Sequence, residues 1–141
     1  MGPAYAQPEL TEGALMTARA ELVAICDRYV EMVDAGDTDG IMELYADDCW
    51  IEDPIGSERK AGKDVIREFY AGIAAMDVNP KMRRIGPVTV CGGEAAFQFR
   101  IDIDLGQMQI KMTSTDVMTF DEAGKITSMR AFADGEADPD V

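Results

Sequence analysis

Apolar and polar residues alternate through most of the second half of the chain, and this two-residue period constrains the fold more than any other feature. The apolar positions of two such runs are Phe97, Phe99, Ile101, Ile103 and Leu105, then Ile110, Met112, Met118 and Phe120. Gly106-Gln107 separates the runs, and further turn residues lie at 91–94 and 121–124. The pattern predicts antiparallel strands joined by tight turns, with a last strand over Ile126 to Ala133. One face of this sheet is apolar and must be covered by other elements.

The first half of the chain has the three- to four-residue period of helices that bury one side. The apolar stripe of the first helix consists of Leu15, Ala18, Leu22, Cys26, Tyr29 and Val33. Gly36 is suited to end this helix, and Asp37 to cap a second, short helix whose buried side includes Tyr45. A third helix is predicted from about Lys63 to Met76.

The order of these elements predicts a single α+β domain, because helices come first and an antiparallel meander follows. A strand over Met82–Val90 is expected to break at Gly86-Pro87, since proline cannot donate to a strand ladder. We place the domain at 14–133, after a flexible N-terminal extension at 1–13 and before an acidic tail at 134–141.

Composition narrows the possible chemistry. The chain has 141 residues, 13 basic and 27 acidic, for a net charge of −14, and it has no histidine. The missing histidine excludes Ser-His-Asp triads, Cys-His pairs and histidine metal sites. The acid excess argues against nucleic-acid partners and anionic membranes, and no apolar run approaches the ~20 residues of a membrane span. Three widely spaced cysteines, Cys26, Cys49 and Cys91, indicate free thiols. We therefore expect a cytoplasmic protein with no metal site.

Asp116 interrupts an apolar strand face, because it shares parity with Ile110, Met112, Met118 and Phe120. Burial would raise the pKa of its carboxyl and favour the protonated form, which donates a hydrogen bond. The alternative is a register slip or a bulge that turns Asp116 to solvent. The pattern alone leaves both open.

Asp53 ends a short alternating strand that begins at Cys49 and stops at Pro54. Its side chain shares a face with Cys49 and Ile51. It is either a turn-forming aspartate at a strand end or an ionised base at the mouth of a cavity. Both readings fit the sequence.

Three tyrosines lie on the apolar stripes of the three predicted helices: Tyr29, Tyr45 and Tyr70. Each is suited to ordinary core packing, but a buried phenol needs a hydrogen-bond partner. Together they could form a chain of hydroxyl groups that ends in a pocket. Met112, Met118 and Met129 on the inner strand faces fit either a core or a pocket for a flat apolar ligand.

Four stretches between roughly Glu21 and Phe132 form a recognisable series: DRYVEMVDAGDTDGIMELYADDCWIEDPIG, GKDVIREFYAGI, GEAAFQFRI and STDVMTFDEAGKITSMRAF. They resemble the steroid Δ-isomerases, or ketosteroid isomerases, of the nuclear transport factor 2-like superfamily. The resemblance implies a cone in which a curved, mostly antiparallel sheet packs on three N-terminal helices. It also implies a homodimer that converts 3-oxo-Δ5-steroids to their conjugated Δ4 isomers without a cofactor.

The resemblance also assigns roles to five residues. Tyr29 and a protonated Asp116 would donate hydrogen bonds to the oxyanion of the steroid, and Asp53 would be the base that carries the proton. Tyr45 and Tyr70 match tyrosines that hold the first tyrosine in a hydrogen-bonded network. For the steroid pocket we expect Phe69, Phe99, Met112, Met118 and Met129.

One residue of this chain, Ala133, departs from the family pattern. Ala133 stands where family members have a bulky aromatic residue beside the base, so we expect a wider pocket or a better hydrated base. Other enzymes of this fold, such as polyketide cyclases, dehydratases and epoxide hydrolases, are the second hypothesis. The lack of histidine argues against the dehydratases, and no arginine is placed with Asp53 and Asp116 as an epoxide hydrolase requires. A non-catalytic binder of small apolar ligands or of a protein partner ranks last.

Overall fold

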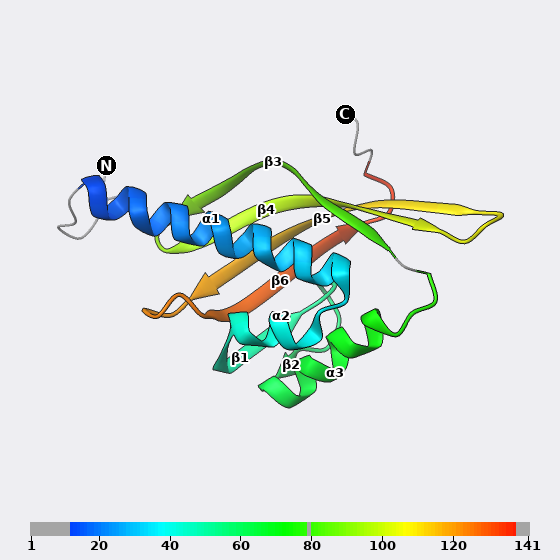
Figure 1. Ribbon diagram of the computed structural model, residues 1–141, viewed down its shortest axis with the longest axis horizontal. Coiled ribbons are helices and arrows are strands. Elements are labelled where there is room, and N and C mark those ends of the chain that lie inside the picture. Colours follow the sequence, from blue (N-terminus) through cyan, green and yellow to red (C-terminus); the bar gives the residue numbers. More distant parts are fainter. Residues whose placement is uncertain (1–11, 79, 138–141) are drawn as a thin grey trace.

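The helices and strands of this α+β chain assemble on one six-stranded sheet, described by a computed structural model over residues 12–78 and 80–137 (Figure 1). In chain order the elements are α1 (Glu12–Ala35), α2 (Thr38–Leu44), β1 (Tyr45–Glu52), β2 (Lys60–Ala61), α3 (Lys63–Ala74), β3 (Lys81–Cys91), β4 (Glu94–Asp104), β5 (Gln109–Phe120) and β6 (Ile126–Asp134). The strand order is β2-β1-β6-β5-β4-β3, and only the β1–β6 pair is parallel. Helix α1 packs along β3 and β4, while α2 and α3 lie together beside β1 (Figure 1).

Glycine-containing turns join the antiparallel strands where the alternation predicts them. Gly92 and Gly93 have φ of 60° and 77°, a conformation that hairpin turns need and that few other residues adopt. Leu105 N–H donates to the Met108 carbonyl across the Gly106-Gln107 turn at 2.9 Å. The β4–β5 register runs without a shift between these turns, so parity along β5 is maintained over its whole length.

The core lies between α1 and the face of the sheet that α1 covers, which we call the inner face. The predicted α1 stripe is buried from Leu22 onward, but Ala18 is exposed, which corrects the prediction for that position. The side chain of Leu15 lies outside the described part of the chain. At the other end of the sheet, Leu105 is 41% exposed, because the β4–β5 hairpin extends past the helices (Figure 1).

The predicted break in the strand before residue 91 is wrong. β3 runs without a break from Lys81 to Cys91. Gly86-Pro87 lies where the pairing register with β4 shifts, between Ile85 and Thr89. Because β3 is an edge strand, the missing N–H of Pro87 need not interrupt a ladder on its free side.

The sequence also misplaces Tyr45 and the loop before α3. Tyr45 is not helical: it is the C-cap of α2, with φ −90° and ψ 144°, and the first residue of β1. It pairs with Ile126 of β6, and this contact between distant segments sets the point where helix becomes strand. Lys60 and Ala61, predicted as loop, form the short strand β2, and α3 ends at Ala74 rather than Met76.

Several predictions concern the chain ends, cysteines and membrane spans. Residues 1–11 of the predicted extension and 138–141 of the predicted tail lie outside the described residues, while Glu12 and Gly13 already belong to α1. The three cysteines are free, as predicted, with Cys26 and Cys49 buried and Cys91 exposed. No helix in the described part of the chain has the length and hydropathy that crossing a membrane requires.

The capping role predicted for Asp37 is confirmed. Its Oδ1 accepts the backbone N–H of Gly40 at 3.0 Å. A Cβ at residue 40 would crowd the Asp37 carboxylate, so a larger residue there would force this carboxylate to shift. The cap fixes the start of α2, whose last turn leads directly to Tyr45.

We expect Asp37→Ala to lower the free energy of unfolding by about 1 kcal/mol, because one helix N–H loses its acceptor. Asp37→Asn is the matched control and should stay close to wild type, since asparagine offers the same oxygen. Urea unfolding followed by circular dichroism measures both. Equal losses in the two variants would show that the charge of Asp37 matters rather than its cap.

Candidate active site

Asp116 lies at the centre of the inner face, with only 1% of its surface exposed. Its neighbours across the sheet are Phe97 on β4 and Ala131 on β6. Burial raises the pKa of the Asp116 carboxyl well above its usual range, a hydrogen bond from Ser114 opposes this, and the nearby Asp53 adds to it. The solvent-facing alternative for Asp116 is therefore wrong, and a neutral carboxylic acid is the favoured form.

Ser114 is a neighbour of Asp116 that sequence reasoning did not single out. Its Oγ donates to Asp116 Oδ1 at 2.9 Å, and both side chains are buried. The two residues are two positions apart on β5 and therefore share a face. That spacing was the available signal, since a hydroxyl two residues from a buried acid is a ready hydrogen-bond partner.

Asp53 reaches the inner face through a turn that is fastened to β6. The Ile55 N–H donates to the Ala131 carbonyl at 2.8 Å, and Ala131 is the register partner of Asp116. The Asp53-Pro54 peptide bond is cis. Burial raises the pKa of Asp53 to about 6, while the ammonium group of Lys60 pulls it down. The two inward acids thus have different environments and different affinities for a proton.

The three predicted tyrosines form a hydrogen-bonded chain with Tyr70 in the middle. Tyr70 Oη lies 2.9 Å from Tyr29 Oη and 2.7 Å from Tyr45 Oη, and all three rings are buried. They come from α1, α3 and the first residue of β1. Burial raises the pKa of Tyr29 well above its usual range, so its phenol keeps its proton.

Each phenol has one proton, and in each of the two hydrogen bonds either oxygen could be the donor. Donation from Tyr45 to Tyr70 and from Tyr70 to Tyr29 would leave the proton of Tyr29 available to a further acceptor.

The five side chains expected to line a steroid pocket come from α3 and from strands β4, β5 and β6. Phe69 packs edge-on against Tyr70, with ring centroids 5.1 Å apart, and Phe99 stacks on Phe97 at 5.9 Å. Met118 and Met129 are cross-strand partners with no exposed surface, and Met112 is half-buried. In this structure the two buried methionines are core residues, and their contact with a ligand stays a prediction.

The two acids have different neighbours: Ala133 lies beside Ser114, the partner of Asp116, and Lys60 lies near Asp53. Ala133 is exposed and is the register partner of Ser114. The Lys60 Nζ lies 5.1 Å from the ring centroid of Phe69 and close enough to Asp53 to lower its pKa. Sequence reasoning read Lys60 as part of a polar loop, whereas it pairs with Ile51 of β1, nine residues earlier in the chain.

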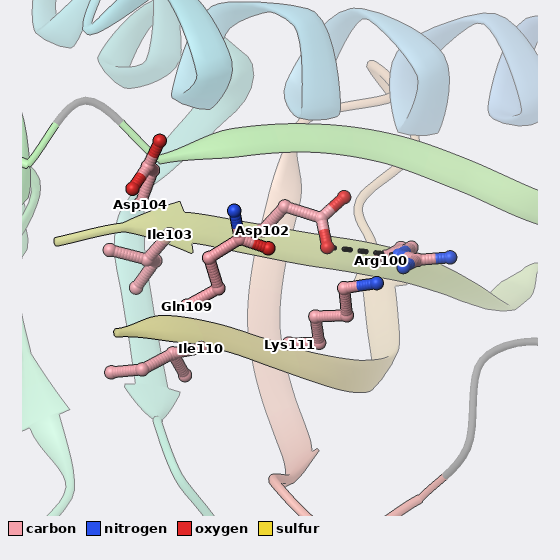
Figure 2. Close-up of a pocket in the computed structure, with 7 residues that line it drawn as sticks. All are labelled: Arg100, Asp102, Ile103, Asp104, Gln109, Ile110 and Lys111. Carbon is pink, nitrogen blue, oxygen red and sulfur yellow. Dashed lines mark hydrogen bonds and ion pairs between the residues drawn. The ribbon is translucent and has the colours of Figure 1, made fainter. Parts of the chain in front are cut away.

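A hollow of about 250 Å³ lies elsewhere, on the β4–β5 hairpin (Figure 2). Its lining is Arg100, Asp102, Ile103, Asp104, Gln109, Ile110 and Lys111. Figure 2 shows the Asp102 carboxylate turned toward Arg100, and the two are paired at 3.0 Å. None of the predicted site residues lines this hollow, so it is separate from the acids and tyrosines.

Within residues 12–78 and 80–137, no three Cys, Asp or Glu side chains come together in a way that could hold a metal ion. Asp116 is accompanied instead by the hydroxyl group of Ser114, which is a neutral hydrogen-bond donor.

Comparison with known proteins gives concordant results. Residues 26–129 match the SnoaL-like domain family, and this range contains Tyr29, Asp53 and Asp116. A protein of Nocardioides simplex named Steroid Delta-isomerase is 42% identical over 113 residues, which cover 80% of this chain and 89% of that protein. On both the domain match and the extent of this identity, the chain belongs to the SnoaL-like, nuclear transport factor 2-like superfamily and, within it, to the steroid Delta-isomerase family.

Proposed function

We propose that this protein is an isomerase that converts 3-oxo-Δ5-steroids to 3-oxo-Δ4-steroids by moving one proton within the substrate. The observation that carries the proposal is the grouping of a half-buried acid with a pKa of about 6, a fully buried acid and a tyrosine chain. Their similarity to the family pattern and the 42% identical relative support it. We further propose that the protein is cytoplasmic, forms a homodimer and acts without a cofactor.

The first step is the removal of a proton by Asp53. The carbon between the ketone and the double bond is acidified by both groups, and the Asp53 carboxylate takes its proton. The electron pair moves onto the carbonyl oxygen and gives a dienolate. Asp53, now neutral, returns the same proton to the far end of the conjugated system, which re-forms the ketone and leaves the double bond in conjugation. A pKa near 6 suits this work, because the base is ionised at neutral pH and still holds a proton well.

The negative charge on the oxygen is stabilised by Tyr29 and Asp116. Both groups are neutral donors when protonated, and burial favours that state for each of them. Donors already fixed in an apolar site stabilise a developing charge more than water does, because they need no reorganisation. Tyr70 and Tyr45 hold the Tyr29 phenol in place and orient its proton toward the substrate.

The direct test is an ultraviolet assay for the conjugated enone formed from a Δ5-3-ketosteroid. We expect Asp53→Ala to lower kcat by about 10²- to 10⁴-fold with little change in KM, since it removes general-base catalysis. Asp48→Ala, which removes an exposed acid on β1, the strand before Asp53, is the control and should match wild type. Wild-type protein without turnover would refute the proposed reaction, and an active, folded Asp53→Ala variant would refute only the base assignment.

The acid side of the pH profile should report Asp53. Only the ionised carboxylate accepts a proton, so kcat/KM is expected to fall as the pH drops through about 6. Lys60→Gln removes a positive charge that lowers the pKa of Asp53, so its acid limb should move to higher pH. Steady-state kinetics between pH 4 and pH 9 test this at roughly half-unit steps. A limb near pH 4 would mean that Asp53 is far better hydrated than its burial indicates.

Substitutions at Asp116 distinguish a neutral donor from a base. Asp116→Asn keeps a donor of similar shape, while Asp116→Leu keeps volume and removes the donor. Loss of one oxyanion donor costs roughly 10²- to 10³-fold in kcat, so we expect Leu to lose that much and Asn far less. Equal inactivity of the two folded variants would instead identify Asp116 as a base, and equal near-wild-type activity would remove it from the site.

A further inference from the structure

We infer that Ser114 is a positioning residue that fixes which oxygen of Asp116 carries the proton. The inference rests on the proposed function, because it concerns the acid that would donate to the oxyanion. It adds a residue to which the family resemblance assigns no role.

The geometry around Ser114 isolates one hydrogen bond in apolar surroundings. Ser114 Oγ lies 2.9 Å from Asp116 Oδ1, and the two residues are 2% and 1% exposed. In the sheet register, Ser114 lies between Phe99 and Ala133, two register positions along from the partners of Asp116. In such a site a hydrogen bond is strong and an unpaired oxygen is costly.

A neutral carboxyl group has one proton and two oxygens, so its usefulness as a donor depends on where the proton resides. If Ser114 donates to Oδ1, that oxygen is the acceptor and the proton of Asp116 stays on Oδ2, free for the substrate. Donation to Oδ1 also polarises the carboxyl group and strengthens the Oδ2 donor. The opposite arrangement, in which Asp116 donates to Ser114 Oγ, would use up the proton before the substrate arrives. These two arrangements predict opposite effects of removing the hydroxyl.

The first measurement compares Ser114→Ala with Thr113→Val. Thr113 is the adjacent residue on β5 and is also buried, but its Oγ1 has no hydrogen-bond partner among the described residues. We expect Ser114→Ala to lower kcat about 3- to 10-fold, the rate equivalent of one hydrogen bond, with KM unchanged. Thr113→Val should not change either constant. Ser114→Thr should restore kcat, because it restores the hydroxyl.

The second measurement repeats Ser114→Ala in two Asp116 backgrounds. In Asp116→Asn the amide oxygen takes the place of Oδ1, so losing the hydroxyl should again lower kcat about 3- to 10-fold. In Asp116→Leu there is no acceptor to position, so Ser114→Ala should leave the residual kcat unchanged. A role in folding alone would lower kcat equally in all three backgrounds.

The outcomes separate the two levels of the proposal. A rise in kcat for Ser114→Ala, no change, or an equal loss in the Asp116→Leu background would overturn the role of Ser114 while leaving the proposed function intact. Wild-type protein without isomerase activity would overturn the proposed function and Ser114 with it. Should Ser114→Ala not fold, as judged by circular dichroism, Ser114→Cys keeps the volume with a weak donor and should show the same loss.

Discussion

The burial of one carboxyl group on the inner face of the sheet is the constraint on which this site depends. An ionised Asp116 would be costly among Phe97, Ala131 and the rest of the inner face, so the protein stabilises it as a neutral acid. A neutral acid is a hydrogen-bond donor, whereas a carboxylate is only an acceptor. The apolar sheet face thereby changes the chemistry of aspartate without any change of residue type.

The second acid gains its different character from its place in the fold. Asp53 lies in a turn at the end of β1 rather than in the middle of a strand, and the hydrogen bond from Ile55 to Ala131 holds that turn beside the buried acid. Its partial exposure and the positive charge of Lys60 keep its pKa near 6. One acid is therefore ionised and the other protonated at neutral pH. The two aspartates differ in protonation because one is fully buried on the inner face and the other lies in a partly exposed turn.

Local sequence pattern was sufficient for much of this arrangement. The two-residue period placed Asp116 on the apolar face, and helical periodicity placed Tyr29 and Tyr70 on buried stripes, because both features depend on neighbouring residues alone. The same reasoning failed for Tyr45, whose conformation is set by pairing with Ile126, some eighty residues away. It also failed at Gly86-Pro87, where the position of β3 at the sheet edge decides the outcome.

Contacts between distant segments explain what else the sequence did not predict. The order of the tyrosine chain requires α1, α3 and β1 to meet at one point, and no spacing within a segment specifies that Tyr70 is central. The proximity of Lys60 to Asp53, which are only seven residues apart, is a shorter-range effect that arises once β2 has paired with β1. Ser114 is a different case, since its relation to Asp116 is local and the alternation already put the two on one face.

The absence of cations from the described hydrogen-bonding partners of Tyr29 and Asp116 has a physical rationale. An arginine or lysine beside a developing oxyanion would stabilise it, but it would equally stabilise the ionised form of Asp116 and lower its pKa. The acid would then lose the proton that makes it a donor. Hydroxyl and carboxylic acid groups avoid this conflict, because they stabilise the oxyanion without holding a net charge beforehand. The net charge of −14 is compatible with such a site, because exposed charges are screened within about 10 Å by salt, whereas donors in direct contact are not. In the proposed reaction, neutral donors therefore let one buried acid stay protonated while a second acid nearby acts as the base.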